Sequence, residues 1–73
     1  DVQLAVLALL TTGNLSRKAI FEAIGMTGDS RSFKRNIEPL ITSGLVEMTV
    51  PGKPSSRQQK YRLTASGKAR LNI

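Results

Sequence analysis

The periodicity of apolar residues changes once along the chain, at Gly44, and this change restricts the fold more than any other feature. After Gly44, the segments "LVEMTV" (45–50) and "QKYRLT" (59–64) both alternate apolar and polar residues. Such alternation predicts two half-buried strands. The loop between them, "PGKPSSR" (51–57), is too long for a tight hairpin turn. The inward-facing residues of the two strands are expected to be Val46, Met48, Val50, Tyr61 and Leu63.

The residues before Gly44 predict helices joined by short connections. Residues 2–10, "VQLAVLALL", contain no Gly or Pro and predict a first helix that ends at Gly13. A short extended connector follows, with Leu15 pointing inward, and Ser16 is a suitable N-cap for a second helix over 17–25. The inner face of the second helix is expected to consist of Ile20, Ala23 and Ile24, and Gly25 is expected to end it.

A third helix is predicted over residues 31–44, "RSFKRNIEPLITSG", with Asp29 or Ser30 as its N-cap. Its apolar residues fall at i, i+4, i+7 and i+8, which defines one buried face. Pro39 removes a hydrogen bond from this helix, so we expect a kink or a tightened last turn there but no break. Gly44 is suited to the left-handed C-terminal cap. The buried face comprises Phe33, Ile37, Leu40 and Ile41.

The predicted order is helix, short strand, helix, turn, helix, strand, loop, strand. This order is that of a winged helix-turn-helix domain, an α+β fold of three helices and a two- or three-stranded antiparallel sheet. We expect one domain over residues 1–73, cut from a longer protein of which it is the C-terminal module. Residues 65–71, "ASGKARL", can form a short closing helix or a fraying tail. No apolar run reaches the ~18 residues of a membrane span, so a cytoplasmic protein is expected.

The charge distribution favours a polyanionic partner. The net charge is +6, and residues 48–73 hold six cations and no acid. Nucleic acid, anionic lipid and acidic protein all fit this balance. The chain has no His and no Cys, which removes the commonest general base and most nucleophile and transition-metal sites. We therefore expect neither an enzyme nor a bound cofactor or metal.

Double-stranded DNA is the expected partner, because the second helix of a helix-turn-helix enters the major groove with its N-terminal half. The "PGKPSSR" loop would contact the phosphate backbone or the minor groove. Pro51 would end the strand pairing, and Pro54 would stiffen the loop by fixing its backbone torsions. Two other interpretations remain open: the helix cations form a solvated face, or the loop cations only prevent the hairpin edge from pairing. The candidate DNA-binding residues are Ser30, Arg31, Lys34, Arg35, Lys53, Ser55, Ser56, Arg57, Lys60 and Arg62.

The stretch "FKRNIEPLITSGLVEMTVPGKPSSRQQKYRLTASGK" (33–68) resembles the C-terminal winged-helix domain of many bacterial Fic-family proteins. Similar domains end proteins assigned as RecG-like helicases or as transcriptional regulators with a Schlafen-like AlbA domain. The resemblance rests on "PL" late in the third helix, "GL" into the strand, and "SRQQKYRLT" through the hairpin. It implies a bacterial or archaeal accessory module behind a larger N-terminal part. It does not imply Fic activity, whose motif needs a His.

A second interpretation is a protein-interaction or dimerisation module that regulates the larger protein without binding DNA. The first helix has more apolar surface than the stripe of roughly 100° that a small domain needs. If the core buries the side of Val2, Val6, Leu9 and Leu10, then Leu4 and Leu7 project away from it. Those two leucines are the candidate contacts for a homodimer or for the N-terminal domain of the larger protein.

Overall fold

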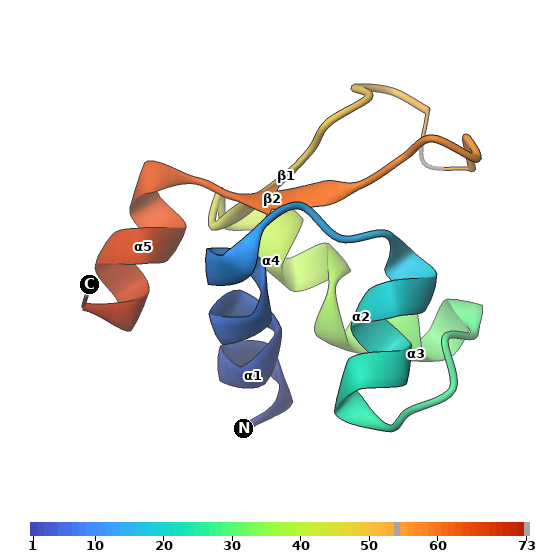
Figure 1. Cartoon of the computed structure of the whole chain (residues 1–73), viewed down its shortest axis with the longest axis horizontal. Coiled ribbons are helices and arrows are strands. Elements are labelled where there is room, and N and C mark those ends of the chain that lie inside the picture. Colours follow the sequence, from blue (N-terminus) through green and yellow to red (C-terminus); the bar gives the residue numbers. More distant parts are fainter. Residues whose placement is uncertain (54, 73) are drawn as a thin grey trace.

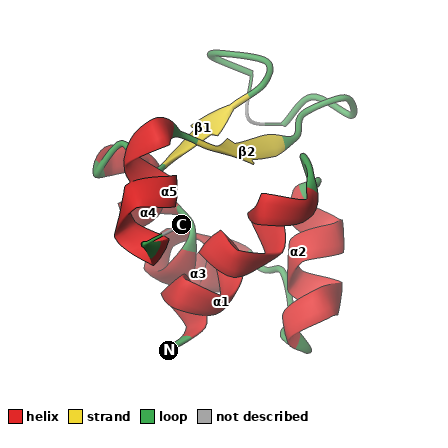
Figure 2. Cartoon of the chain, turned by 60° about the vertical axis from the view of Figure 1, so that its left-hand side comes forward, coloured by secondary structure: helices red, strands yellow, loops and turns green. Residues whose placement is uncertain are grey.

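The computed structural model describes residues 1–53 and 55–72; Pro54, to which the sequence assigned a stiffening role, and Ile73 lie outside the described residues. The helices all lie on one side of a two-stranded hairpin, and the loop of the hairpin extends beyond them (Figures 1 and 2). The elements in chain order are α1 (Val2–Leu9), the 3₁₀ helix η1 (Leu10–Thr12), α2 (Arg17–Ile24), α3 (Ser30–Asn36), α4 (Glu38–Thr42), β1 (Val46–Met48), β2 (Tyr61–Leu63) and α5 (Ala65–Leu71).

The hairpin and the caps have the predicted geometry. Strands β1 and β2 are antiparallel, with Val46 opposite Leu63 and Met48 opposite Tyr61. A third strand is reduced to one bridge, in which Leu15 N–H donates to Tyr61 O (3.1 Å) and Tyr61 N–H to Leu15 O (2.8 Å). The Ser16 hydroxyl caps α2 as expected. The winged helix-turn-helix prediction is therefore confirmed.

Helix α1 buries a different face from the one expected. Leu7 is 1% exposed and belongs to the core with Val6 and Leu10, so the expectation that it projects away from the core is wrong. Leu4 does project outward, with 39% of its surface exposed. The physical reason is that α1 packs against both α2 and α5, which covers more of its circumference than a single partner would.

The buried face of α2 also differs from the prediction. Phe21 is 2% exposed, whereas Ala23, which was expected to face inward, is exposed. Phe21 is buried because the turn after α2 passes over its ring: a Cβ on Gly28 would lie 3.0 Å from Phe21 Cδ2. The core thus consists of Val6, Leu7, Leu10, Ile20, Phe21, Ile37, Leu40, Val46 and Tyr61.

The third predicted helix is divided into α3 and α4, so the expectation of no break at Pro39 is wrong. Pro39 is in the first turn of α4 and has no N–H to donate to the carbonyl four residues earlier. Ile37 lies between the two helices with φ −102°, and its carbonyl accepts from the N–H groups of both Leu40 and Ile41. This division leaves α3 only seven residues long.

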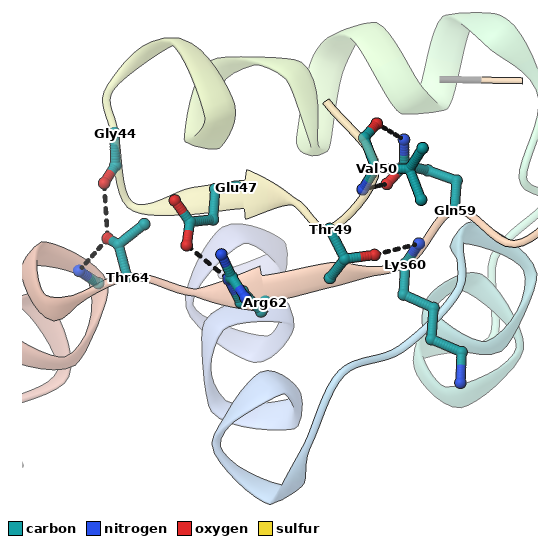
Figure 3. Close-up of polar contacts among 9 residues, drawn as sticks. Gly44, Glu47, Thr49, Val50, Gln59, Lys60, Arg62 and Thr64 are labelled. Atoms are coloured by element: carbon teal, nitrogen blue, oxygen red, sulfur yellow. Dashed lines mark hydrogen bonds and ion pairs between the residues drawn. The ribbon is translucent and has the colours of Figure 1, made fainter. Parts of the chain in front are cut away.

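The closing segment 65–71 is a helix, α5, and Thr64 joins it to the hairpin (Figure 3). The Thr64 hydroxyl donates to Gly44 O (2.6 Å) and accepts from Gly67 N–H (3.0 Å). Gly67 is buried, and it lies so close to the backbone of Leu45 that there is no room for a side chain. A Cβ on Gly67 would lie 2.2 Å from Leu45 O. Within the described part of the chain, no helix combines the length and apolarity that crossing a bilayer requires.

Candidate nucleic-acid interface

One face of α3 presents a cationic surface along the length of this short helix. Asp29 caps the helix by accepting from Ser32 N–H (2.8 Å), and this hydrogen bond lowers the pKa of Asp29. The next residues on one face of α3, at i, i+1, i+4 and i+5, are all exposed and line a shallow groove of about 560 Å³. These are Ser30, Arg31, Lys34 and Arg35, which the structure brings together as predicted.

The loop between β1 and β2, residues 49–60, is called the wing below. Gly52 has φ +75° and follows Pro51, the arrangement of a type II turn, and Lys53 N–H donates to Val50 O (3.3 Å). Lys53 and Arg57 are exposed at either end of the wing's distal part, and between them Ser55 is exposed and Ser56 half-buried. The wing therefore presents its cations to solvent, as the sequence predicted.

A cleft of about 550 Å³ separates the returning arm of the wing from the start of α2. Ser55, Ser56 and Arg57 line it on the wing side, and Arg17 and Lys18 line it on the α2 side. Arg17 and Lys18 are not among the candidates predicted from the sequence, because nothing in their local pattern indicates which distant segment they face. The cationic surface of the wing thus continues onto α2.

Lys60 and Arg62 lie apart from the α3 groove. They alternate with Tyr61 along the strand, so they face away from the side of the sheet that carries the helices. Arg62 forms the one ion pair of the described residues, between its Nε and Glu47 Oε1 (Figure 3). Its charge is therefore partly compensated, and the structure does not bring these two residues to the predicted surface of α3.

Arg17 connects α2, the turn and α3. Its Nε and Nη2 donate to Gly28 O at 3.1 and 2.7 Å, and its guanidinium lies 4.7 Å from the centroid of the Phe33 ring. Phe33 in turn contacts Tyr61, with ring centroids 6.0 Å apart. Burial raises the pKa of Tyr61, and the nearby charge of Arg17 opposes this effect. Arg17 therefore helps to hold α3 in place.

Gln59 is a third residue that is absent from the candidates predicted from the sequence. It is 5% exposed, and its Nε2 donates to the carbonyl oxygens of Val50 (2.5 Å) and Lys53 (2.8 Å). Its Oε1 accepts from Val50 N–H (3.0 Å; Figure 3). In the alternating pattern of the strand, Gln59 resembles any exposed polar residue. The local sequence therefore does not indicate that Gln59 is buried and hydrogen-bonded to the wing.

The chemistry of this surface is that of charged and hydrogen-bonding contacts. Arginine, lysine and serine side chains can donate to phosphates and base edges. No three acidic side chains in the described ranges lie close enough together to hold a metal ion. With the helices packed against a two-stranded hairpin and cations on both α3 and the wing, the fold defines a winged helix-turn-helix domain.

Comparison with known proteins gives the family. The family model for the C-terminal domain of Fic-like proteins (filamentation induced by cAMP) matches residues 2–64. The chain therefore belongs to the Fic-like C-terminal domain family. A comparison with curated proteins gave no match.

Two solved structures are similar to the chain. A Fic family protein from Desulfovibrio desulfuricans is 32% identical with a TM-score of 0.68, over 86% of this chain and 20% of that one. A winged helix-turn-helix DNA-binding domain from Mycobacterium bovis is 33% identical with a TM-score of 0.71, over 96% of this chain and 59% of that one. The latter is described as homodimeric and as a possible ArsR-family transcriptional regulator.

Proposed function

We propose that the domain binds double-stranded DNA, with α3 in the major groove and the wing on the phosphate backbone. The observation that carries this proposal is the groove of α3, where Ser30, Arg31, Lys34 and Arg35 are all exposed on one face. A recognition helix contacts base edges from its first turn, where Ser30 and Arg31 lie, and Lys34 and Arg35 follow one turn later on the same face of α3. The Mycobacterium bovis domain, described as DNA-binding, supports the same reading.

The domain would act as the C-terminal accessory module of a larger prokaryotic protein, in the cytoplasm where its DNA is found. The similarity to one fifth of a Fic family protein supports this part of the proposal. The domain itself would perform no catalysis, since the sequence has no His or Cys to act as base or nucleophile.

The cations of α3 and those of the wing are suited to different contacts with DNA. Arginine can bond bidentately to guanine, so Arg31 and Arg35 are suited to reading bases. Lys53 and Arg57 lie on the wing and are suited to phosphates, which supply most of non-specific affinity. The alternative is that the α3 cations are only a solvated face, and the binding experiment separates the two.

Duplex binding is expected to be strongly salt-dependent. With about four to six cations on phosphates, the slope of log K against log salt should be about −4 to −5. Non-specific Kd values should be ~10⁻⁴ to 10⁻⁶ M near physiological salt. Fluorescence anisotropy with a duplex of ~20 base pairs, repeated at several salt concentrations, measures both quantities. Absence of binding at ~50 mM salt would refute the proposal.

Single substitutions then assign the contacts. Arg31→Ala or Arg35→Ala should weaken binding to a preferred sequence by ~1–3 kcal/mol and reduce discrimination between sequences. Lys53→Ala or Arg57→Ala should weaken all duplexes alike and reduce the salt slope by about one. Lys68→Ala is the matched control, because Lys68 is exposed on α5 at the opposite end of the molecule from the wing (Figure 1). Equal effects at Lys68 and Lys53 would mean that only net charge matters.

We propose self-association through α1 as a second function. Beside the exposed Leu4, an apolar groove of about 600 Å³ runs between α1 and α2. The occupant we propose is a second copy of the domain, because the 33% identical Mycobacterium bovis domain is described as homodimeric. Leu7 takes no part in this contact, since it is buried in the core. The groove is lined by Asp1, Val2, Ala5, Ala8, Leu9, Thr12, Ala23 and Ile24.

Charge introduced on the exposed face of α1 should shift a dimer to monomer. Leu4→Glu or Ala8→Glu would place a carboxylate in the proposed apolar contact, where its desolvation is costly. Sedimentation equilibrium over a wide concentration range measures the change, and circular dichroism checks that the fold is kept. Ala69→Glu, on an exposed position of α5, is the control. A wild-type domain that stays monomeric throughout would exclude self-association.

A further inference from the structure

The wing consists of three consecutive turns, and Gln59 forms a hydrogen bond to the first residue of each turn. Backbone hydrogen bonds run from Lys53 N–H to Val50 O, from Ser56 N–H to Lys53 O, and from Gln59 N–H to Ser56 O. The Gln59 side chain then returns to the beginning of the series and donates to the carbonyls of both Val50 and Lys53. One residue therefore contacts the first residue of each turn, and its side chain is almost fully buried.

Few other contacts hold this part of the wing. The described residues from Pro51 to Gln58 are exposed apart from Ser56, and none of them belongs to the apolar cluster around the core. A loop without apolar anchors depends on its polar contacts for order. The buried amide of Gln59 supplies three of them, to Val50 N–H, Val50 O and Lys53 O.

We propose that Gln59 is the positioning residue of the wing, whose amide fixes the separation of Lys53 and Arg57 before any ligand binds. Its consequence for DNA rests on the function proposed above. The site needs two donors and one acceptor in a single planar group, and a glutamine amide provides these. A carboxylate has no donor, and a lysine has no acceptor. A wing ordered in advance loses less conformational entropy on docking, which strengthens binding without a direct contact from Gln59.

The first test measures wing order and does not depend on DNA. In Gln59→Ala, amide hydrogen exchange followed by NMR should be at least ~10-fold faster at Val50, whose N–H donates to Gln59 Oε1. Exchange at Ile20 and Phe21, in the core, should be unchanged. Unchanged exchange at Val50 would refute the positioning role. Equal acceleration at Val50 and Ile20 would also refute it, because Gln59 would then support the whole fold.

The second test uses a pH-dependent variant. Gln59→Glu places a carboxylate against the carbonyl oxygens of Val50 and Lys53, and this raises the pKa of the introduced carboxyl. Glu22, on the same cleft, acts in the same direction, whereas the cations Arg17, Lys18 and Arg57 there oppose the rise. The closed wing is then favoured only when the carboxyl is protonated, so it is lost as the pH rises and returns as the pH falls. The chain has no histidine, so no other side chain is expected to titrate in the same range.

Duplex affinity of Gln59→Glu should be roughly tenfold below wild type at pH ~7.5, with the salt slope smaller by one to two. Between pH ~7.5 and ~5, part of this loss should be recovered relative to wild type at the same pH, because the protonated carboxyl supplies one of the two donors that the amide provides. Gln58→Glu is the matched control: it adds the same charge one residue earlier, on an exposed side chain. It should show a smaller loss and no recovery.

The outcomes separate the two proposals. If Gln59→Glu and Gln58→Glu behave alike at every pH, the positioning role is wrong even where the wild type binds DNA. If the wild type binds no duplex, the proposed function is wrong, and the exchange rate at Val50 alone decides the role of Gln59. Faster exchange confined to the wing would then support positioning, and unchanged exchange would exclude it.

Discussion

Leu7→Ala is expected to lower the free energy of unfolding by about 2–5 kcal/mol, the range for deleting a fully buried leucine side chain. Leu7 is 1% exposed in the core, so the substitution removes buried apolar surface and leaves a cavity. Small domains have a total stability of only ~5–15 kcal/mol, so this change should unfold a measurable fraction of the protein. Urea denaturation followed by circular dichroism measures the difference.

Leu4→Ala is the control for this prediction. It is the same substitution on the same helix, at a position that is 39% exposed, and should cost less than about 1 kcal/mol. Equal losses at the two positions would contradict the packing of α1 described above. A stable Leu7→Ala domain would have the same meaning, because it would place Leu7 outside the core.

Gly67→Ala is expected to destabilise the domain by about 1–3 kcal/mol or more, as overpacking does. Helix propensity alone predicts the opposite, a gain of up to ~1 kcal/mol for alanine over glycine inside a helix. The added Cβ would lie 2.2 Å from Leu45 O and 2.6 Å from Leu63 Cδ1, so α5 would have to move away from the hairpin. Thermal unfolding gives the sign of the effect directly.

Ser66→Ala, one residue earlier on α5, is the matched substitution. Ser66 is exposed, so only helix propensity applies and the change should be neutral or slightly stabilising. If Gly67→Ala raised the melting temperature as Ser66→Ala does, the close approach of α5 to Leu45 would be wrong.

Features set by local chemistry could be predicted from the sequence. The Ser16 cap, the left-handed glycines at 25 and 44, and the alternation around Tyr61 each depend on residues within one turn or strand. The exposure of Arg31 and Arg35 also followed, because the apolar period of the third helix leaves them on the opposite face. DNA binding by these residues stays a prediction until duplex binding is measured.

Features set by distant segments could not be predicted. The burial of Leu7 and Phe21 depends on α5 and on the turn at Gly28, which no local pattern places. The contact of Arg17 with Gly28 and the contacts of Gln59 with Val50 and Lys53 join residues that are six to eleven positions apart in the sequence. The cleft between the wing and the start of α2, which Lys18 lines, likewise depends on segments that are distant in the sequence. The effect of Pro39 was underestimated because the apolar period continues through it.

If the domain binds DNA as proposed, the break before Pro39 limits how much sequence information α3 can read. At 1.5 Å per residue, the seven residues of α3 extend only about 10 Å. Base pairs are spaced by about 3.4 Å, so a helix of this length faces about three of them. Three base pairs carry about six bits, and a matching site would occur roughly once in every 64 positions of random DNA. One copy would therefore find a match in almost every gene, and selection of a single locus would require a second copy or a further reading element.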